Sequence, residues 1–355
     1  MKNKALKVIQ NDIEKKGFDW VAGETSVVEL SEEEQQGLLG LHVTKEELKA
    51  TEELIKASDN FQRVNAPLSL PSVVDWRNKN GDWTTPIRNQ QSCGSCVAFG
   101  TIATIEARLN IACQNPNADK DLSEAYLFYC GCGNCCGRGW NFAPALDFCK
   151  NTGVALESSF PYTPHNQACP SSVSKYLNIS AWNRVLSIQE RKQILATKGP
   201  VLGGMAVYSD FYSYKSGVYR KTPNSTFRGY HAISIVGYDD NQQCWICKNS
   251  WGTGFGDNGW FKIGYGECKL DTAFPFYDID VACKEGCKKY ATQAIKYRNL
   301  YNKTKKPIYL CYFYIYAAYY FLCKYRLNHE KRYYCYYVKY MEKYYACRHK
   351  NDCTK

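Results

Sequence analysis

The chain has 355 residues, 45% hydrophobic and 22% charged, a composition that excludes disordered and collagen-like proteins and predicts roughly two domains. The formal net charge of +11 is unevenly distributed. Residues 283–355 carry 17 Lys and Arg against 4 Asp and Glu, whereas residues 1–282 carry 28 against 30. This last stretch also holds 17 of the 29 Tyr and 7 of the 19 Cys, so we place a domain boundary near Cys283.

The cysteine content bears on the cellular compartment. Nineteen cysteines exceed ordinary cytosolic usage and indicate disulfides, a metal cluster or both. Disulfides favour an extracytoplasmic or lysosome-like compartment. Residues 1–18 contain no apolar stretch of signal-peptide length, which argues against ordinary secretion. The compartment is therefore left unassigned.

The first 68 residues contain two runs of apolar residues at helical spacing, the second rich in Lys and Glu. Such a small amphipathic region could bury little surface alone. Residues 65–72 contain two prolines and predict an extended, exposed connection. The apolar residues of the two runs are Leu6, Ile9, Ile13, Leu48, Leu54 and Ile55.

From Val73 onward the pattern is that of a mixed α/β enzyme. A long buried helix is predicted from Ser95 to Cys113, with its apolar residues on one stripe. A second helix should begin at Ser187, which has capping-box spacing to Glu190, and end before Gly199. Residues 232–238, 244–248 and 259–263 are short, rich in β-branched or aromatic side chains, and predict strands of a sheet or barrel.

A candidate nucleophile lies at the start of the first of these helices. In QQSCGSC, residues 90–96, the last cysteine immediately precedes the helical pattern. The thiolate is the reactive form, and the free amides and dipole of a helix N-terminus lower the pKa of a thiol. Cys96 is therefore the candidate, although a buried cysteine taken alone is more often an inert small hydrophobic residue.

A cysteine nucleophile needs a base, and His231 is selected by elimination. It begins a predicted buried strand, where its ring would be held rigidly. Asn249, at the end of the next strand, could orient the imidazole, and Trp251 could shield that hydrogen bond from water. The remaining histidines lie in the leading helices, a Pro/Asn loop and the tail: His42, His165, His329 and His349.

These motifs, in this order, resemble those of papain-like cysteine proteases of the papain/cathepsin family, over roughly residues 70–280. The resemblance implies an α+β, two-lobed fold with a helical lobe, a β-barrel-like lobe and the active cleft between them. It implies Cys96 as nucleophile, His231 as its partner, Asn249 as orienter and Gln90 as an oxyanion-hole donor with the Cys96 amide. The matching stretches are 74–77 (VDWR), 89–99 (NQQSCGSCVAF), 122–124 (LSE) up to Cys130, 230–233 (YHAI), 236–238 (VGY) and 248–254 (KNSWGTG).

The same resemblance implies a substrate-binding surface. Gly139 takes the place of the glycine that binds substrate backbone. The pocket for the second residue before the scissile bond has its floor at Ala273, and Trp140, Phe142 and Ala232 among its walls. No carboxylate lies at that floor, so we expect a hydrophobic preference. The chain lacks a neighbouring histidine pair of the kind that caps the cleft in carboxydipeptidase relatives, so cleavage should be internal.

The resemblance also implies disulfides Cys93–Cys136 and Cys130–Cys169. Cys132 and Cys135 are then extra, and their spacing fits a further disulfide better than a zinc site, which stays open as the alternative. Cys268 lacks its family partner. Two positions depart from the family pattern: Gln91 replaces a Gly, and Val97 replaces the Trp after the nucleophile.

The tail supports several interpretations. Cys311, Cys323, Cys335 and Cys347 recur every 12 residues, and residues 307–323 are uncharged, the lower limit for a membrane span. A helical, disulfide-linked accessory module is favoured. A membrane-associated segment and an altered reading frame or otherwise nonfunctional extension stay open. We expect no nucleic-acid partner and do not favour membrane contact through 307–323.

The prediction is a cysteine endopeptidase acting on protein or peptide substrates without a cofactor or metal. Residues 1–68 are predicted to be an inhibitory prosegment removed near residues 65–72, residues 69–282 the peptidase domain, and residues 283–355 a basic extension. The alternatives are a transferase or amidase with the same Cys-His-Asn residues, and a papain-fold binding protein whose activity has lapsed.

Overall fold

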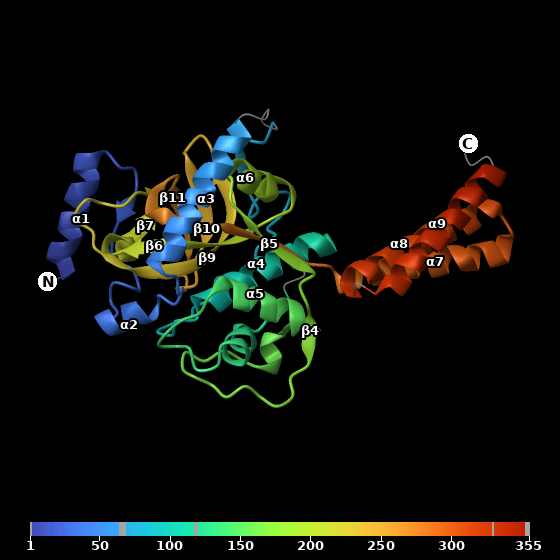
Figure 1. Ribbon diagram of the computed structural model, residues 1–355, viewed down its shortest axis with the longest axis horizontal. Helices are drawn as coiled ribbons and strands as arrows, with labels where there is room; N and C mark the ends of the chain where they lie inside the picture. Colours follow the sequence, from blue (N-terminus) through green and yellow to red (C-terminus); the bar gives the residue numbers. More distant parts are fainter. Residues whose placement is uncertain (1, 64–68, 117–119, 329, 352–355) are drawn as a thin grey trace. The chain divides into compact units, whose positions relative to one another are not determined.

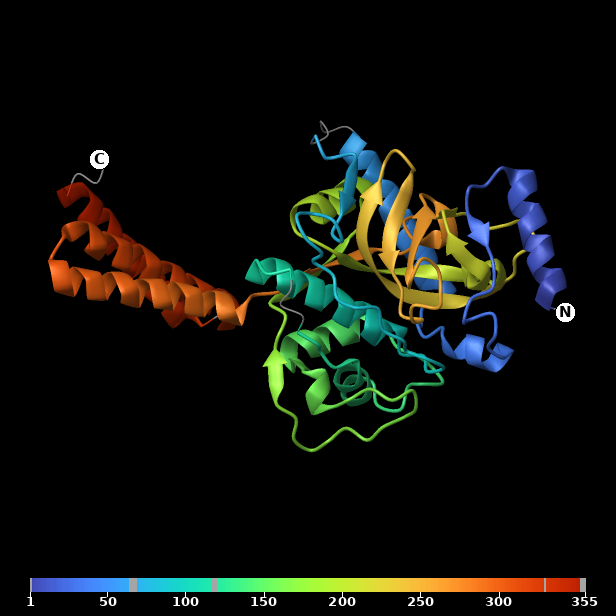
Figure 2. The same ribbon diagram turned by 180° about the vertical axis from the view of Figure 1, so that it is seen from behind.

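The computed structural model describes residues 2–63, 69–116, 120–328 and 330–351 and contains two compact units (Figures 1 and 2). The first unit comprises Met1–Ile111 and Asn115–Asp280, and the second comprises Ala112–Gln114 and Val281–Lys355. The predicted maturation segment, residues 65–72, falls partly outside the described residues, and His329 lies outside them.

An eight-stranded sheet forms the β-rich lobe of the first unit, in the order β5-β12-β6-β9-β10-β11-β8 with β2 paired to β9. β9 is central: it pairs with β6, β10 and β2, and it is buried from His231 to Asp239. Within the described chain the edge strands β5 and β8 do not pair, so the barrel-like lobe is an open sheet. The strands are β2 (Val73–Asp75), β5 (Ala181–Val185), β6 (Val201–Tyr208), β8 (Val218–Tyr219), β9 (Phe227–Asp239), β10 (Cys244–Lys248), β11 (Trp260–Gly264) and β12 (Phe276–Asp280).

Helix α4 (Cys96–Cys113) leads the helical lobe and packs closely on the sheet. A Cβ added at Gly100 would lie 3.1 Å from a Leu202 methyl and 3.3 Å from the Ile233 nitrogen. Almost every α4 side chain from Cys96 to Asn110 is buried, rather than the single stripe predicted, because sheet and lobe enclose the helix. The lobe also contains a π-helix (Tyr126–Cys130), α5 (Phe142–Asn151), a 3₁₀ turn (Glu157–Ser159) and the paired β3 (Val154–Ala155) and β4 (Lys175–Leu177).

The β-rich lobe carries three further helical elements and one short strand. In α6 (Ile188–Thr197) the Ser187 hydroxyl accepts a hydrogen bond from the Glu190 nitrogen at 3.2 Å, which is half of the predicted capping box. The remaining elements are two 3₁₀ turns (Ser209–Ser213 and Glu267–Lys269) and β7 (Tyr214–Ser216).

The leading residues fold onto this lobe. Helix α1 (Lys2–Lys16) is followed by β1 (Val21–Ala22), which pairs with β7, then by α2 (Glu32–Gly37) and α3 (Lys45–Arg63). Trp20 and Leu38 belong to the same buried core as the sheet. On α3, Leu48 and Ile55 are buried, whereas Leu54 is 50% exposed. The two predicted helices are therefore present, with α2 as an addition.

The second unit contains three helices, α7 (Lys284–Thr304), α8 (Pro307–Asn328) and α9 (Lys331–Asn351). Disulfides Cys287–Cys323 and Cys311–Cys347 join α8 to each neighbour, and Cys113–Cys283 joins the end of α4 to the residue before α7. Among the described helices only α4 is long and apolar enough to cross a membrane, and 78% of it is buried in the protein.

Candidate active site

Cys96 is the first residue of α4, as the sequence predicts. Its sulfur accepts a hydrogen bond from the backbone nitrogen of Ala232 at 3.4 Å. Burial raises the pKa of the Cys96 thiol to about 11, although backbone N–H groups of Ala232, Gly40 and Val97 favour the thiolate. The predicted lowering of this pKa is therefore outweighed by desolvation in this form of the chain.

His231 and Asn249 are in direct contact. His231 Nε2 and Asn249 Oδ1 lie 2.8 Å apart, and Oδ1 also accepts a hydrogen bond from the Ser250 nitrogen. The Trp251 ring lies over the imidazole at 4.7 Å between centroids. Burial lowers the pKa of His231 to about 4, while Asn249 and the Leu38 carbonyl favour its protonated form. Nδ1 makes no hydrogen bond of normal geometry, so the ring and the Cys96 thiol are not hydrogen-bonded.

Gln90 is fully buried and held at both ends of its amide. Its Oε1 accepts a hydrogen bond from the Ser250 hydroxyl at 2.7 Å. Its Nε2 donates to the Cys93 carbonyl at 2.9 Å and to the Leu38 carbonyl at 3.2 Å. The side-chain donor assigned from the sequence to an oxyanion hole therefore binds a carbonyl of the leading region.

Leu38 begins a stretch, residues 38–43, that we call the crossing segment because it contacts both lobes. The Gly40 carbonyl accepts a hydrogen bond from the Trp140 nitrogen at 2.8 Å, and the His42 nitrogen donates to the Trp140 carbonyl at 2.9 Å. The Leu41 nitrogen donates to the Tyr230 carbonyl of β9 at 3.2 Å. Leu41 and Trp140 form a parallel bridge. The chain thus covers Cys96 and His231 with its own backbone.

Three glycines permit this close approach. A Cβ added at Gly40 would lie 1.9 Å from the Gly94 carbonyl oxygen, and one added at Gly139 would lie 2.1 Å from the Gly40 oxygen. Gly139 also has φ 71°, which favours glycine. A side chain at Gly40 or Gly139 would force these backbones apart.

Leu41 of the crossing segment lines a cavity of about 330 Å³ between the leading region and the peptidase region. Two of the residues predicted for the subsite, Phe142 and Ala273, line this cavity. Trp140 and Ala232, expected as walls, are not among its lining residues: Trp140 packs its ring on Gly131 and Phe128, and Ala232 faces the Cys96 sulfur. Six further residues of the peptidase region, none of them predicted from the sequence, line the cavity: Asn141, Ala143, Arg184, Phe274, Pro275 and Tyr277.

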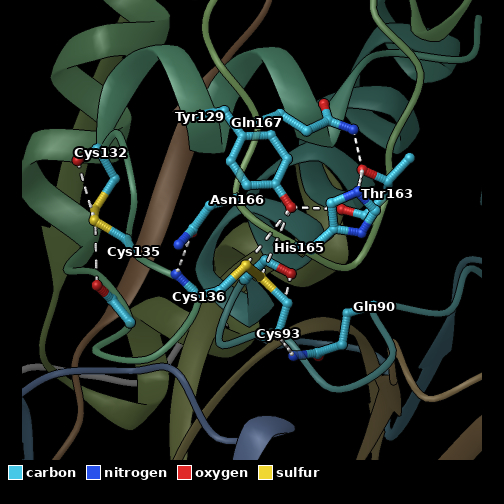
Figure 3. The surroundings of a disulfide bond; sticks show 12 residues. Gln90, Cys93, Tyr129, Cys132, Cys135, Cys136, Thr163, His165, Asn166 and Gln167 are labelled. Carbon is cyan, nitrogen blue, oxygen red and sulfur yellow. Dashed lines mark hydrogen bonds between the residues drawn. A yellow bond between two sulfur atoms is a disulfide. The ribbon is translucent and has the colours of Figure 1, made fainter.

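Disulfides support the loops around the site. The structure contains Cys93–Cys136, whose sulfurs both lie near the Tyr129 hydroxyl, as Figure 3 shows, and also Cys130–Cys169. It links Cys132 to Cys135, so the zinc alternative for that pair is not adopted. Cys268 is a buried free thiol. In the described part of the chain, no group of three or more His, Cys, Asp and Glu side chains is arranged to hold a metal ion.

Comparison with known proteins assigns the chain to a family. The family model described as papain family cysteine protease matches residues 70–277, more than half of the chain. The chain belongs to the papain family. Cysteine proteinases 1 and 2 of Entamoeba histolytica are 35% identical over 213 residues and 37% identical over 218 residues. These matches cover 55% and 58% of this chain, and 64% and 67% of the relatives' own lengths.

Solved structures extend the similarity. The digestive procathepsin L2 proteinase of Tenebrio molitor larval midgut is 27% identical, with a TM-score of 0.64. The superposition covers 79% of this papain-family chain and 91% of that one. The two-lobed papain fold assigned from the sequence is therefore confirmed.

Proposed function

We propose that the chain is a cysteine endopeptidase precursor that is inhibited by its own leading region. One observation carries the proposal: the crossing segment lies against the sulfur of Cys96, the ring of His231 and the amide of Gln90 together. A nucleophile, a base and an oxyanion donor that meet at one backbone stretch are the components of acyl transfer from a peptide.

The reaction follows from the geometry of the same groups. The Cys96 thiol gives its proton to His231 Nδ1, the ring nitrogen that Asn249 leaves free, and the sulfur attacks the scissile carbonyl. Gln90 Nε2 and the Cys96 amide donate to the oxyanion. Collapse breaks the C–N bond as His231 protonates the amine, leaving a thioester. His231 then takes a proton from water, the hydroxide attacks, and the C–S bond breaks.

The leading region acts as an inhibitory prosegment. Its crossing segment makes three backbone hydrogen bonds that a substrate chain would use. It accepts one from the Trp140 nitrogen and donates one each to the carbonyls of Trp140 and Tyr230. Burial under this segment keeps both Cys96 and His231 uncharged, through a raised and a lowered pKa respectively. The reactive thiolate–imidazolium pair would form only after this cover leaves.

The cavity that Leu41 lines supports a hydrophobic preference at the second residue before the scissile bond. Leu41 is 6% exposed and shares the lining of this cavity with Phe142 and Ala273. Burying a Leu or Phe side chain contributes roughly 1.5–3 kcal/mol, whereas a basic side chain would lose hydration at this floor without a carboxylate partner. A peptide library should therefore select large apolar residues at this position, and Ala273→Glu should admit Arg.

The test of the activity uses a quenched peptide and a chain that begins near Pro71, under mild reductant. Cys96→Ala and His231→Ala should each abolish hydrolysis with the fold intact by circular dichroism. The matched control is Cys335→Ala, which removes an exposed thiol and should leave turnover unchanged. Substantial turnover by folded Cys96→Ala would exclude the mechanism.

A further inference from the structure

The three helices of the extension form a layer rather than a closed bundle. On α8, Tyr316 and Tyr319 contact α7 rings and Cys323 bonds to Cys287. Phe321 and Tyr325 contact α9 rings and Cys311 bonds to Cys347. Helices α7 and α9 make at most marginal contact with each other within the described residues. Helix α8 is therefore the middle of a single layer.

A middle helix in one layer keeps two uncovered faces. Ile308, Ile315 and Leu322 recur every seven residues, about 20° apart around the helix, and so form one row along α8. None of the three is buried. The residues that contact α7 and α9 lie at other positions of the helical repeat, so this aliphatic row lies between the two contact sides.

The flanking helices carry most of the charge, and α8 is charged only near its end, at Lys324 and Arg326. Residues 307–323 at the centre have none, while the extension as a whole has a net charge of +13. Lys296 and Lys303 on α7 and Lys339 on α9 are exposed. Helix α9 also exposes Tyr334, which is 48% exposed, and Tyr345, which is 54% exposed. The layer thus presents an aliphatic centre with basic and aromatic margins.

We propose that this layer docks on the surface of an anionic lipid bilayer, with the α8 row against the acyl boundary and the flanking Lys and Arg at the headgroup phosphates. Interfacial helices combine an apolar face with Lys and Arg in this way, and tyrosine rings favour the headgroup region. Helix α8 lies on the membrane and does not span it, since it is not apolar enough to cross. The sequence alone did not favour membrane contact; the layer arrangement changes that interpretation.

Two other occupants fit less well. A second copy would bring two surfaces of +13 together, and their repulsion opposes a face-to-face dimer. A single-stranded nucleic acid would need free aromatic faces for base stacking. The α8 row is aliphatic, and Tyr297 is already stacked on Tyr316 with 8° between the ring planes. Exposed tyrosines such as Tyr334 and Tyr345 lie at the margins and not along the row.

The test uses the full chain carrying Cys96→Ala, which prevents self-cleavage, in flotation with vesicles. Vesicles of phosphatidylcholine with 30% phosphatidylserine should bind at least tenfold more protein than pure phosphatidylcholine. Half-molar salt should remove most of this binding. The double variant Lys296→Glu/Lys339→Glu should lower partition at least tenfold, whereas Lys150→Glu/Lys175→Glu, an equal charge change in the peptidase unit, should not.

Ile315→Gln tests the aliphatic row, because its side chain is partly exposed and circular dichroism can verify that the helices persist. We expect a several-fold loss of binding. Equal binding of the unmodified chain to neutral and anionic vesicles would overturn the proposal, and so would binding of Ile315→Gln to anionic vesicles that matches that of the unmodified chain. So would tighter binding to a single-stranded oligonucleotide than to anionic vesicles, or a salt-stable dimer that hides Ile315.

Discussion

Gly40→Ala should release the crossing segment from the active site. The new methyl carbon would lie 1.9 Å from the Gly94 oxygen and 2.3 Å from the Gly94 carbon, both backbone atoms, whereas ordinary contact needs at least 3.4 Å. The segment must therefore move by more than 1 Å, which breaks both hydrogen bonds to Trp140. At about 0.5–1.5 kcal/mol each, two bonds correspond to about 1–3 kcal/mol.

That loss predicts inhibition weaker by about 5- to 160-fold. The assay measures the inhibition constant of a separate peptide of residues 1–68 against a chain that begins near Pro71. Gly17→Ala is the matched control: its Cβ would meet no atom within 4 Å, so only local strain at φ 63° remains. An inhibition constant for Gly40→Ala within threefold of the unmodified peptide would refute the reasoning, because the clash is then relieved without loss of the backbone bonds.

Three other predictions follow from buried or strained groups. Docking of the prosegment requires neutral His231, because burial lowers the pKa of this ring from 6.5 to about 4. The affinity of the prosegment is therefore fully present above pH 6.5 and should fall toward tenfold per pH unit between pH 6.5 and 4. Titration calorimetry of the 1–68 peptide with the Cys96→Ala chain would measure this fall, and a pH-independent affinity would count against the prediction. Gln91 has φ 51° and is exposed, so Gln91→Gly should raise the free energy of unfolding in urea by about 1 kcal/mol. Arg191 is fully buried and donates to the carbonyls of Val185, Asp271 and Phe274. Arg191→Met should therefore lower the free energy of unfolding by about 3 kcal/mol or more. Phe274 lines the Leu41 cavity, so Arg191→Met should also raise KM more than it lowers kcat. An unaltered KM would mean that the loop containing Phe274 is not part of the subsite.

The sequence singles out the candidate catalytic residues because their signals are local. A cysteine at a helix start, a histidine at the start of an apolar run and an asparagine after the next strand are each fixed by a few neighbouring residues. The strands around them were also predicted to within a few residues, except that β9 begins at Phe227, before the apolar run. Those first residues are partly exposed and carry no hydrophobic pattern.

What the sequence did not provide depends on residues far apart in the chain. Gly40 looks like any loop glycine until the fold brings Gly94 and Gly139 against it. The raised pKa of Cys96 comes from its burial in the folded chain, which no helix-terminus argument contains. Trp140 was assigned a wall of the cavity, but it does not line the cavity, and its backbone bonds to the crossing segment. Long-range packing decides each of these.

The Cys113–Cys283 disulfide alters what a protease cut can accomplish. It closes a loop that includes His231 and Asn249, so the extension is joined to the rest of the chain by two covalent routes. Cleavage of the backbone between residues 280 and 283 would leave both fragments attached, and their separation would require reduction as well. A nicked molecule should therefore migrate as one band on a non-reducing gel and as two bands after reduction, and any trimming of the extension there depends on the thiol–disulfide balance of its surroundings.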